Sequence, residues 1–313
     1  MDSELFQKSR RFYQNKVAPM IKEKFPEYEL RIAVGLSGEG SDCFGYDDFI
    51  SRDHDFGTGV CLWVTENDFH KFGRLLSIAY NELVDSIPGA NLTDRLRERR
   101  GVMTINAFYS YVLGTEINAE DASISENTWR IIDHSCLATA VNGEVFRDDP
   151  GIFSAFRKSL LNYYPDRIWR ERIASELHAF SSSLQVNYSR CMARKDIVAA
   201  EICKADGIKA AMEIFFLLKR VYPPYYKWTY RALTEIDNKG VFSKLIRSLA
   251  ETPCSLSAWE YIRYMPDNLN MSDRIVVITE QIAENIRDVL VESDLTRSEY
   301  TYLELYVNEL LKK

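Results

Sequence analysis

The chain has 313 residues, of which 46% are hydrophobic and 27% are charged, so it is long enough for two domains and has the composition of an ordinary globular protein. Its formal net charge of −7 argues against a general nucleic-acid-binding protein, which would carry a basic patch or a high pI. An anionic partner, if there is one, is therefore expected to be small.

The N-terminal residues lack the apolar core of a signal peptide, and no run approaches the ~20 apolar residues that a bilayer span requires. The six cysteines form no Cys-x-x-Cys pair, so neither a disulfide framework nor a zinc site is indicated. We therefore expect a cytoplasmic protein with reduced thiols and no membrane partner.

The first part of the chain predicts a helix followed by two strands that flank a glycine-rich turn. Apolar residues over 3–24 recur at close to helical spacing. An apolar run over 30–36 then ends in the turn Ser37-Gly38-Glu39-Gly40-Ser41, and a second apolar run covers 60–64. These runs have the length and composition of strands.

Two aspartates come shortly before the second run. Because side chains alternate between the faces of a strand, Asp53 and Asp55 point to one side and His54 to the other. Paired carboxylates suit Mg²⁺ or Mn²⁺, which prefers oxygen ligands and is shared with substrate phosphates. Gly40 lets backbone amides approach a phosphate, and the Ser41 hydroxyl adds a donor. The alternative is a solvated acidic loop whose glycines only mark turns.

Gly40-Ser41 and Asp53-His54-Asp55, twelve positions further on, resemble the signature of the nucleotidyltransferase superfamily. The chain is most similar to the aminoglycoside (kanamycin/streptomycin) nucleotidyltransferase-like branch, and within it to an uncharacterised bacterial family in which a helical domain follows the catalytic one. The resemblance implies an α+β fold: a small mixed-sheet nucleotidyltransferase domain over 1–150, then an all-α helical bundle over 151–313. It also implies that Asp53 and Asp55 hold Mg²⁺ or Mn²⁺, and that Gly40 and Ser41 bind a nucleoside triphosphate, with ATP expected.

A third strand is predicted over 101–105 from its β-branched content. In the resembled family this strand usually contributes a third carboxylate, which often serves as general base. Val102 and Met103 occupy the corresponding positions here, and the nearest acids are Glu98 and Glu116. Metal binding is therefore expected, whereas the residue that usually acts as general base for turnover is missing from this strand.

A helix over 127–140 and a short edge strand over 143–149 are expected to complete the first domain. Glu144, at the start of this strand, is the substitute carboxylate that we consider for catalysis. The alternative is that Glu144 is simply an exposed residue after a glycine turn.

From residue 152 onward the pattern is helical and strand signals vanish. Two long apolar stripes, over 166–192 and 196–221, predict a pair of antiparallel helices. Further amphipathic helices are predicted from residue 225 and over 241–252, 256–264, 272–292 and 296–312.

Two segments of the helical domain carry residues suited to a nucleotide. Tyr188 and Arg190 lie in the first, and Lys227 lies in the second, Tyr222-Pro223-Pro224-Tyr225-Tyr226-Lys227-Trp228. The second segment resembles a motif of the same uncharacterised family where the helical domain faces the nucleotide site. Cationic side chains can bind phosphate and aromatic faces can hold a base or sugar. Core packing of the aromatic residues is the alternative.

Two functions follow from these observations. The first is an enzyme that moves a nucleoside monophosphate from a nucleoside triphosphate to a hydroxyl of a small-molecule acceptor, of aminoglycoside type by the resemblance, with Asp53, Asp55 and Glu144 as catalytic residues. The second is a catalytically impaired nucleotide-binding or sensing protein. A nucleotidyltransferase that modifies a protein or RNA, as in toxin–antitoxin systems, gains no support from the acidic charge. The acceptor, the preferred base and the oligomeric state are left open.

Overall fold

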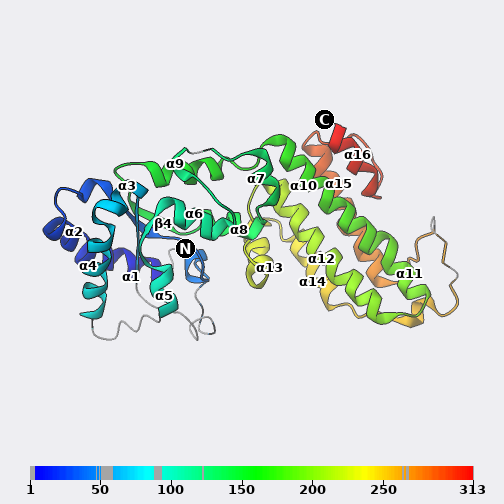
Figure 1. The fold of residues 1–313 in the computed structure, drawn as a ribbon. Helices are drawn as coiled ribbons and strands as arrows, with labels where there is room; N and C mark the ends of the chain where they lie inside the picture. Colours follow the sequence, from blue (N-terminus) through cyan, green and yellow to red (C-terminus); the bar gives the residue numbers. More distant parts are fainter. Residues whose placement is uncertain are drawn as a thin grey trace. The chain divides into compact units, whose positions relative to one another are not determined.

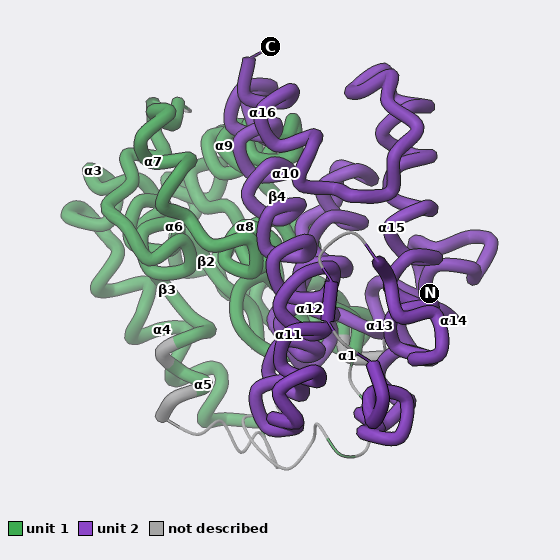
Figure 2. Tube along the Cα trace, turned by 90° about the vertical axis from the view of Figure 1, so that its right-hand side faces the viewer, with its two compact units in different colours: residues 1–163 green, residues 164–313 purple. Residues whose placement is uncertain are grey.

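A computed structural model describes residues 4–46, 48, 50, 59–87, 94–121, 123–262, 264–265 and 268–312. The chain forms two compact units, Met1–Tyr163 and Tyr164–Lys313, which Figure 2 shows in separate colours. In the described residues, unit 1 holds a sheet with helices and unit 2 is helical (Figure 1). The predicted α+β class is therefore confirmed at this level.

The described part of unit 1 contains a four-stranded mixed sheet with the strand order β3-β2-β1-β4. Strand β1 pairs antiparallel with both β2 and β4, while β2 and β3 run parallel. Each strand lies within a range that the sequence predicted. Their bounds are Ala33–Leu36 (β1), Cys61–Val64 (β2), Gly101–Thr104 (β3) and Glu144–Arg147 (β4).

Several helices of unit 1 begin at a side chain that caps them. Thr65, Ser125 and Asp133 each accept a hydrogen bond from a backbone amide of the first turn. Because Asp133 starts a new helix, the range 127–140 holds parts of two helices rather than the single one predicted. The elements are α1 (Glu4–Phe12), α2 (Ala18–Lys24), α3 (Glu66–Asp68), α4 (Arg74–Asp85), α5 (Asp94–Arg99), α6 (Ile105–Leu113), α7 (Glu126–Ile131), α8 (His134–Val141) and α9 (Ile152–Leu161), with π-helical turns at Tyr13–Val17 and Phe69–Gly73 and 3₁₀ turns at Glu29–Arg31, Asp42–Phe44 and Ala119–Asp121.

Both faces of the sheet are covered, because successive side chains of a strand point to opposite faces. On one face, Val34 and Leu62 belong to a core shared with α1, α2 and α4. On the other face, the ring of Trp63 stacks on Phe153 with 3.8 Å between centroids and meets Phe108 edge-on at 5.3 Å. Burial on both faces explains why β1 and β2 are continuous apolar runs rather than alternating ones.

Helix α6 is an element of unit 1 that the sequence did not predict. Thr104 caps it by accepting a hydrogen bond from the amide of Ala107 at 3.0 Å, and Gly114 ends it with a φ of 68°. The predicted domain boundary at residue 150 precedes α9, and α9 belongs to unit 1. The reason is visible in its Phe153, which packs on the sheet.

Unit 2 is built on two long helical stretches that pack against each other, as predicted. Trp169, near the start of α10 (Asp166–Phe180), donates its indole N–H to the carbonyl of Leu217, near the end of α12 (Ile197–Lys219), at 2.8 Å, so the stretches are antiparallel. None of the helices in the described ranges is long and apolar enough to cross a membrane. The remaining elements are the π-helical segment Ser181–Asn187, α11 (Tyr188–Ala193), α13 (Tyr226–Ile236), α14 (Val241–Glu251), a 3₁₀ turn at Leu256–Trp259 within the range 256–264 predicted as a helix, α15 (Arg274–Glu292) and α16 (Glu304–Lys312).

A buried aspartate joins three elements of unit 2. Asp273 is 4% exposed, and its Oδ1 accepts a hydrogen bond from the amide of Ile275 at 2.8 Å, which caps α15. Its Oδ2 accepts from the Tyr188 hydroxyl at 2.9 Å and from the Trp259 indole N–H at 2.6 Å. One carboxylate therefore ties α11 and the 3₁₀ turn to the start of α15.

Candidate functional site

The ends of three strands meet at one edge of the sheet in unit 1. Gly35 of β1 pairs with Cys61 of β2, and Cys61 pairs with Gly101 of β3. Because β1 runs opposite to β2 and β3, the chain leaves β1 at the edge where it enters the other two. The turn after β1 and the residues just before β2 and β3 therefore lie together, and this edge is the candidate site.

The turn after β1 depends on two glycines. Gly38 and Gly40 have φ values of 112° and 120°, which residues with side chains rarely adopt. A Cβ on Gly40 would also lie 2.1 Å from Oδ1 of Asp42. Ser41 follows with a helical φ of −61°, and within the described residues the amides of Gly40 and Ser41 donate no hydrogen bond to the protein. Two successive backbone donors are therefore open to an anion.

Asn142, which follows α8, holds one side of this turn. Its Oδ1 accepts hydrogen bonds from the amide of Gly38 at 2.9 Å and from the hydroxyl of Ser37 at 3.2 Å, and its Nδ2 donates to the Gly38 carbonyl at 2.7 Å. Arg157 of α9 donates to the carbonyls of Val141, Asn142 and Gly143. The turn is thus fixed to helices that cover the sheet.

A buried ion pair holds the other side of the turn. Arg100 is 2% exposed, and its Nη2 donates to Oδ2 of Asp42 at 2.8 Å. Oδ1 of Asp42 accepts from the amide of Cys43 at 2.9 Å. Arg100 also packs against Gly59, since a Cβ on Gly59 would lie 3.2 Å from Cγ of Arg100. One arginine therefore contacts both the turn after β1 and the residue that leads into β2.

Two buried thiols complete this cluster. Nη2 of Arg100 donates to Sγ of Cys43 at 3.3 Å, and Sγ of Cys61 donates to the carbonyl of Arg99 at 3.3 Å. Burial raises the pKa of both thiols, and the Arg100 guanidinium only partly offsets this. Burial lowers the pKa of Arg100, but the negative charges of the Asp42 carboxylate and of Cys43 and Cys61 once these are deprotonated outweigh it, and the net shift is upward. The cluster therefore keeps a fixed cation beside protonated thiols at neutral pH.

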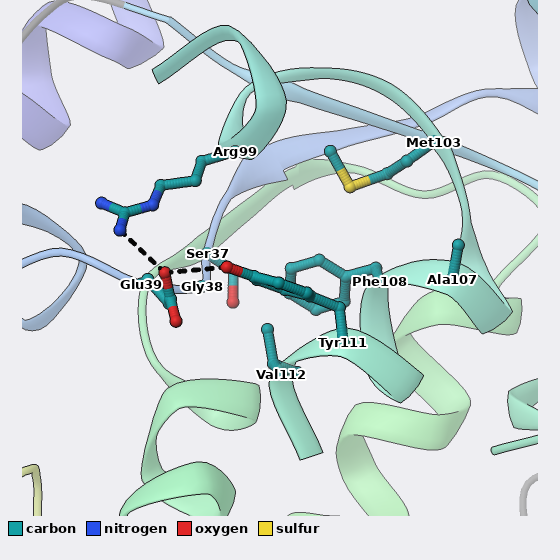
Figure 3. A pocket seen from close by; sticks show the side chains of 9 residues that line it. All are labelled: Ser37, Gly38, Glu39, Arg99, Met103, Ala107, Phe108, Tyr111 and Val112. Atoms are coloured by element: carbon teal, nitrogen blue, oxygen red, sulfur yellow. Dashed lines mark hydrogen bonds and ion pairs between the residues drawn. The ribbon is translucent and has the colours of Figure 1, made fainter. Parts of the chain in front are cut away.

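A cavity of about 320 Å³ opens beside the turn (Figure 3). Oε2 of Glu39 forms an ion pair with Nη2 of Arg99 at 2.9 Å and accepts a hydrogen bond from the Tyr111 hydroxyl at 3.1 Å, so both side chains point toward this carboxylate. Met103 of β3 and Phe108 of α6 provide apolar walls. The cavity thus combines an aromatic lining with one polar edge.

The predicted residues of the first domain are only partly described. Gly40 and Ser41 lie in the turn at the strand edge. Asp53, His54 and Asp55 lie outside the described residues. Among the residues that are described, no three Cys, His, Asp or Glu side chains gather as metal ligands would.

Glu144, the predicted substitute carboxylate, begins β4 and pairs in register with Leu36 at the end of β1. Both of its carboxylate oxygens accept hydrogen bonds from Arg10 of α1, and the two side chains are 37% and 39% exposed. On β3, Val102 packs against the core that includes α1, α2 and α4, and Met103 lines the cavity. The described strand β3 therefore carries no carboxylate, as the sequence indicates.

The predicted nucleotide-binding residues of unit 2 differ in exposure. Tyr188 is 0% exposed, and its hydroxyl donates to Asp273. Arg190 is exposed on α11, with its Nε 3.2 Å from the Tyr264 hydroxyl and its guanidinium 5.9 Å from the centre of that ring. Lys227 is exposed in the first turn of α13. The two cations reach solvent, whereas Tyr188 is enclosed.

Several residues at the strand edge were not singled out from the sequence. Glu39 lies between the two glycines of the turn, and Arg99-Arg100 directly precede an apolar strand. A charged doublet at the start of a buried strand is a signal that could have been used, because a buried arginine needs an acidic partner. Asn142 could have been noted as the polar residue before Gly143 at a helix end.

Comparison with known proteins gives one partial match. A family described as a domain of unknown function, DUF4037, matches residues 129–229. This stretch is about a third of the chain; it includes Glu144, Tyr188, Arg190 and Lys227 but not the glycine turn. No curated protein and no solved structure matches the chain.

Proposed function

We propose that the protein is a Mg²⁺-dependent nucleotidyltransferase that moves a nucleoside monophosphate from a nucleoside triphosphate, with ATP expected, to a hydroxyl of a small-molecule acceptor. The observation that carries the proposal is the glycine turn after β1, whose Gly40 and Ser41 amides are open to phosphate oxygens. The turn is held from both sides through Gly38 and Asp42, so the Gly40 and Ser41 amides keep their position although neither donates to a described residue. Such preorganised donors are what a transferred phosphate group requires.

The predicted metal ligands fit this edge of the sheet by chain order. In the sequence, Asp55 precedes Gly59 by four positions, and Gly59 packs against Arg100 at the site. Carboxylates are the ligands that Mg²⁺ takes when it is shared with phosphates, so Asp53 and Asp55 would hold the ion. The small mixed sheet also supports the nucleotidyltransferase fold that the sequence resembles.

The reaction that we propose is a single displacement at phosphorus. The acceptor hydroxyl oxygen bonds to the α-phosphorus, the bond from that phosphorus to the bridging oxygen breaks, and pyrophosphate leaves. The hydroxyl proton passes to a carboxylate, for which Glu144 is the residue predicted, or to solvent. A bound Mg²⁺ supplies positive charge that offsets the charge of the phosphates. By the resemblance, the acceptor is of aminoglycoside type.

A second candidate function is nucleotide binding without turnover. It is favoured by the described strand β3, which offers Val102 and Met103 where a third carboxylate is expected, and by Glu144, whose carboxylate is occupied by Arg10. In that case the protein keeps the phosphate-binding turn and lacks a positioned base.

Calorimetry tests the shared binding step. We expect Asp53→Asn and Asp55→Asn each to lower Mg²⁺-dependent triphosphate affinity at least tenfold, with the melting temperature within a few degrees of wild type. Asp206→Asn, an exposed position on α12, is the matched control and should leave the affinity unchanged. Unchanged affinity in both site variants would refute the proposed site. Steady pyrophosphate release with a panel of hydroxyl acceptors would then separate the transferase from the binding-only protein.

A further inference from the structure

The cavity beside the glycine turn has walls that suit a flat ring. Phe108 and Tyr111 of α6 contribute aromatic faces, and Met103 of β3 adds a polarisable thioether. Aromatic and thioether side chains bind planar rings through stacking and dispersion. At about 320 Å³, the space is within the range of small-ligand sites.

The polar edge of the cavity offers both an acceptor and a donor. The Glu39 carboxylate accepts N–H groups, and the Arg99 guanidinium donates to carbonyl oxygens or ring nitrogens. The Glu39 side chain is 42% exposed, whereas that of Arg99 is 14% exposed, so the carboxylate is the more accessible partner. A ring with adjacent donors and acceptors along one edge, as every nucleobase has, matches this pair.

The position of the cavity relates it to the phosphate-binding turn. Gly38 and Glu39 line the cavity, and Gly40 and Ser41 directly follow them in the same turn. A ligand with phosphates on the amides of Gly40 and Ser41 would therefore have its other end beside the cavity.

We propose that this cavity binds the nucleobase of the triphosphate, stacked between Met103 and the aromatic residues of α6, with Glu39 accepting hydrogen bonds from the N–H groups of the base. The proposal rests on the proposed function, because it takes the phosphates to lie on the glycine turn. It makes α6 the element that gives the site its preference for a nucleotide over a bare polyphosphate.

Ala107→Phe tests the proposal with little risk to folding. Ala107 lines the cavity, is exposed and lies in the first turn of α6, so a phenylalanine there fills the opening and removes no contact. Ala205→Phe, the same change at an exposed position of α12, is the matched control. The probes are the four common ribonucleoside triphosphates and inorganic tripolyphosphate, each with Mg²⁺, measured by calorimetry.

We expect wild type and Ala205→Phe to bind at least one nucleoside triphosphate tenfold or more tightly than tripolyphosphate. Ala107→Phe should bind tripolyphosphate as wild type does and lose the tenfold preference. Equal affinity of wild type for tripolyphosphate and all four nucleotides, or a preference that survives Ala107→Phe, would overturn the cavity as the base site while leaving the phosphate site intact. Failure of wild type to bind any probe would overturn both proposals.

Glu39→Gln gives an independent readout. The change replaces an acceptor oxygen by an N–H donor, so it should alter which of the four bases is preferred. It also removes a negative charge near the phosphates, which raises the affinity for all probes, tripolyphosphate included. The ranking of the bases is therefore the decisive measurement, and an unchanged ranking would show that Glu39 does not contact the base.

Discussion

Asp42 in unit 1 and Asp273 in unit 2 are both buried aspartates. Their Oδ1 atoms have the same kind of partner, whereas their Oδ2 atoms have different ones. Each has an Oδ1 that accepts a hydrogen bond from a nearby backbone amide, that of Cys43 in one case and of Ile275 in the other. The Oδ2 of Asp273 accepts from two neutral donors, whereas the Oδ2 of Asp42 accepts from the guanidinium of Arg100.

The different partners of the two Oδ2 atoms indicate different roles for Asp42 and Asp273. Neutral donors from separate elements make Asp273 a junction that holds helices together. A buried ion pair gives little net stability compared with an apolar pair of similar size, because both charges lose their hydration. Asp42 and Arg100 are therefore better explained by the turn that they support, whose amides stay open to an anion, than by stability alone.

Arg100→Met is the change with the largest expected effect on this comparison. It leaves the Asp42 carboxylate buried without its cation, so the free energy of unfolding of unit 1 should fall by about 3–5 kcal/mol. Hydrogen exchange followed by mass spectrometry across a urea series measures this for each unit separately. Arg97→Met, which breaks a more exposed ion pair with Asp85, is the control and should cost about 0–1 kcal/mol.

A double variant identifies the cause of that loss. Asp42→Asn keeps an oxygen that can accept from the Cys43 amide and removes the charge, so adding it to Arg100→Met should restore part of the lost stability. If the double variant is no more stable than Arg100→Met alone, the uncompensated charge is not the reason for the loss. The charge of the Asp42–Arg100 pair would then matter no more than that of Asp273, whose Oδ2 bonds only to neutral donors in the described residues.

Tyr188→Phe probes the other side of the comparison and should have an intermediate effect. It removes one hydrogen bond to the buried Asp273 carboxylate, so the free energy of unfolding of unit 2 should fall by about 1.5–3 kcal/mol. Tyr264→Phe removes a hydroxyl that accepts from the exposed Arg190, and it should change the free energy of unfolding by about 0.5 kcal/mol or less. We expect triphosphate affinity to stay the same. Weaker binding without loss of stability would instead make Tyr188 the nucleotide contact that the sequence predicted.

Strands β1 and β2 could be predicted because each is a short apolar run next to a glycine-containing segment, a local pattern that needs no knowledge of neighbours. Helix α6 was missed because its residues, Ile105 to Leu113, are mostly aromatic or β-branched and resemble a strand when read alone. Its helical state depends on the Thr104 cap and on packing against Trp63. The compact units divide after residue 163 rather than at residue 150, and the packing of α9 on the sheet, which groups α9 with unit 1, is likewise not visible in the sequence of α9 alone.

The site was predictable to the extent that it is local in sequence. Gly38 and Gly40 predict a turn, and the position of this turn after β1 follows from chain order. The ion pair between Asp42 and Arg100 joins residues far apart in sequence, and so do the bonds from Asn142 to Gly38. These partners are brought together by the order of the strands in the sheet, which no local pattern fixes.

Glu144→Gln breaks the partly exposed ion pair with Arg10, in contrast to the buried pair of Asp42 and Arg100. It should have the smallest effect on stability. Glu144 and Arg10 are both more than a third exposed, so the loss should be about 0–1 kcal/mol. If Glu144 is the general base of a transferase, pyrophosphate release should nevertheless fall by about 10²–10⁴-fold. Arg10→Gln is the informative partner, because it removes the same ion pair and leaves the carboxylate present. We expect Glu144→Gln to lower pyrophosphate release by this factor and Arg10→Gln to retain it. Equal release in the two variants would mean that Glu144 only links β4 to α1, in the way that Asp273 links α15 to α11. That result would favour the binding-only function.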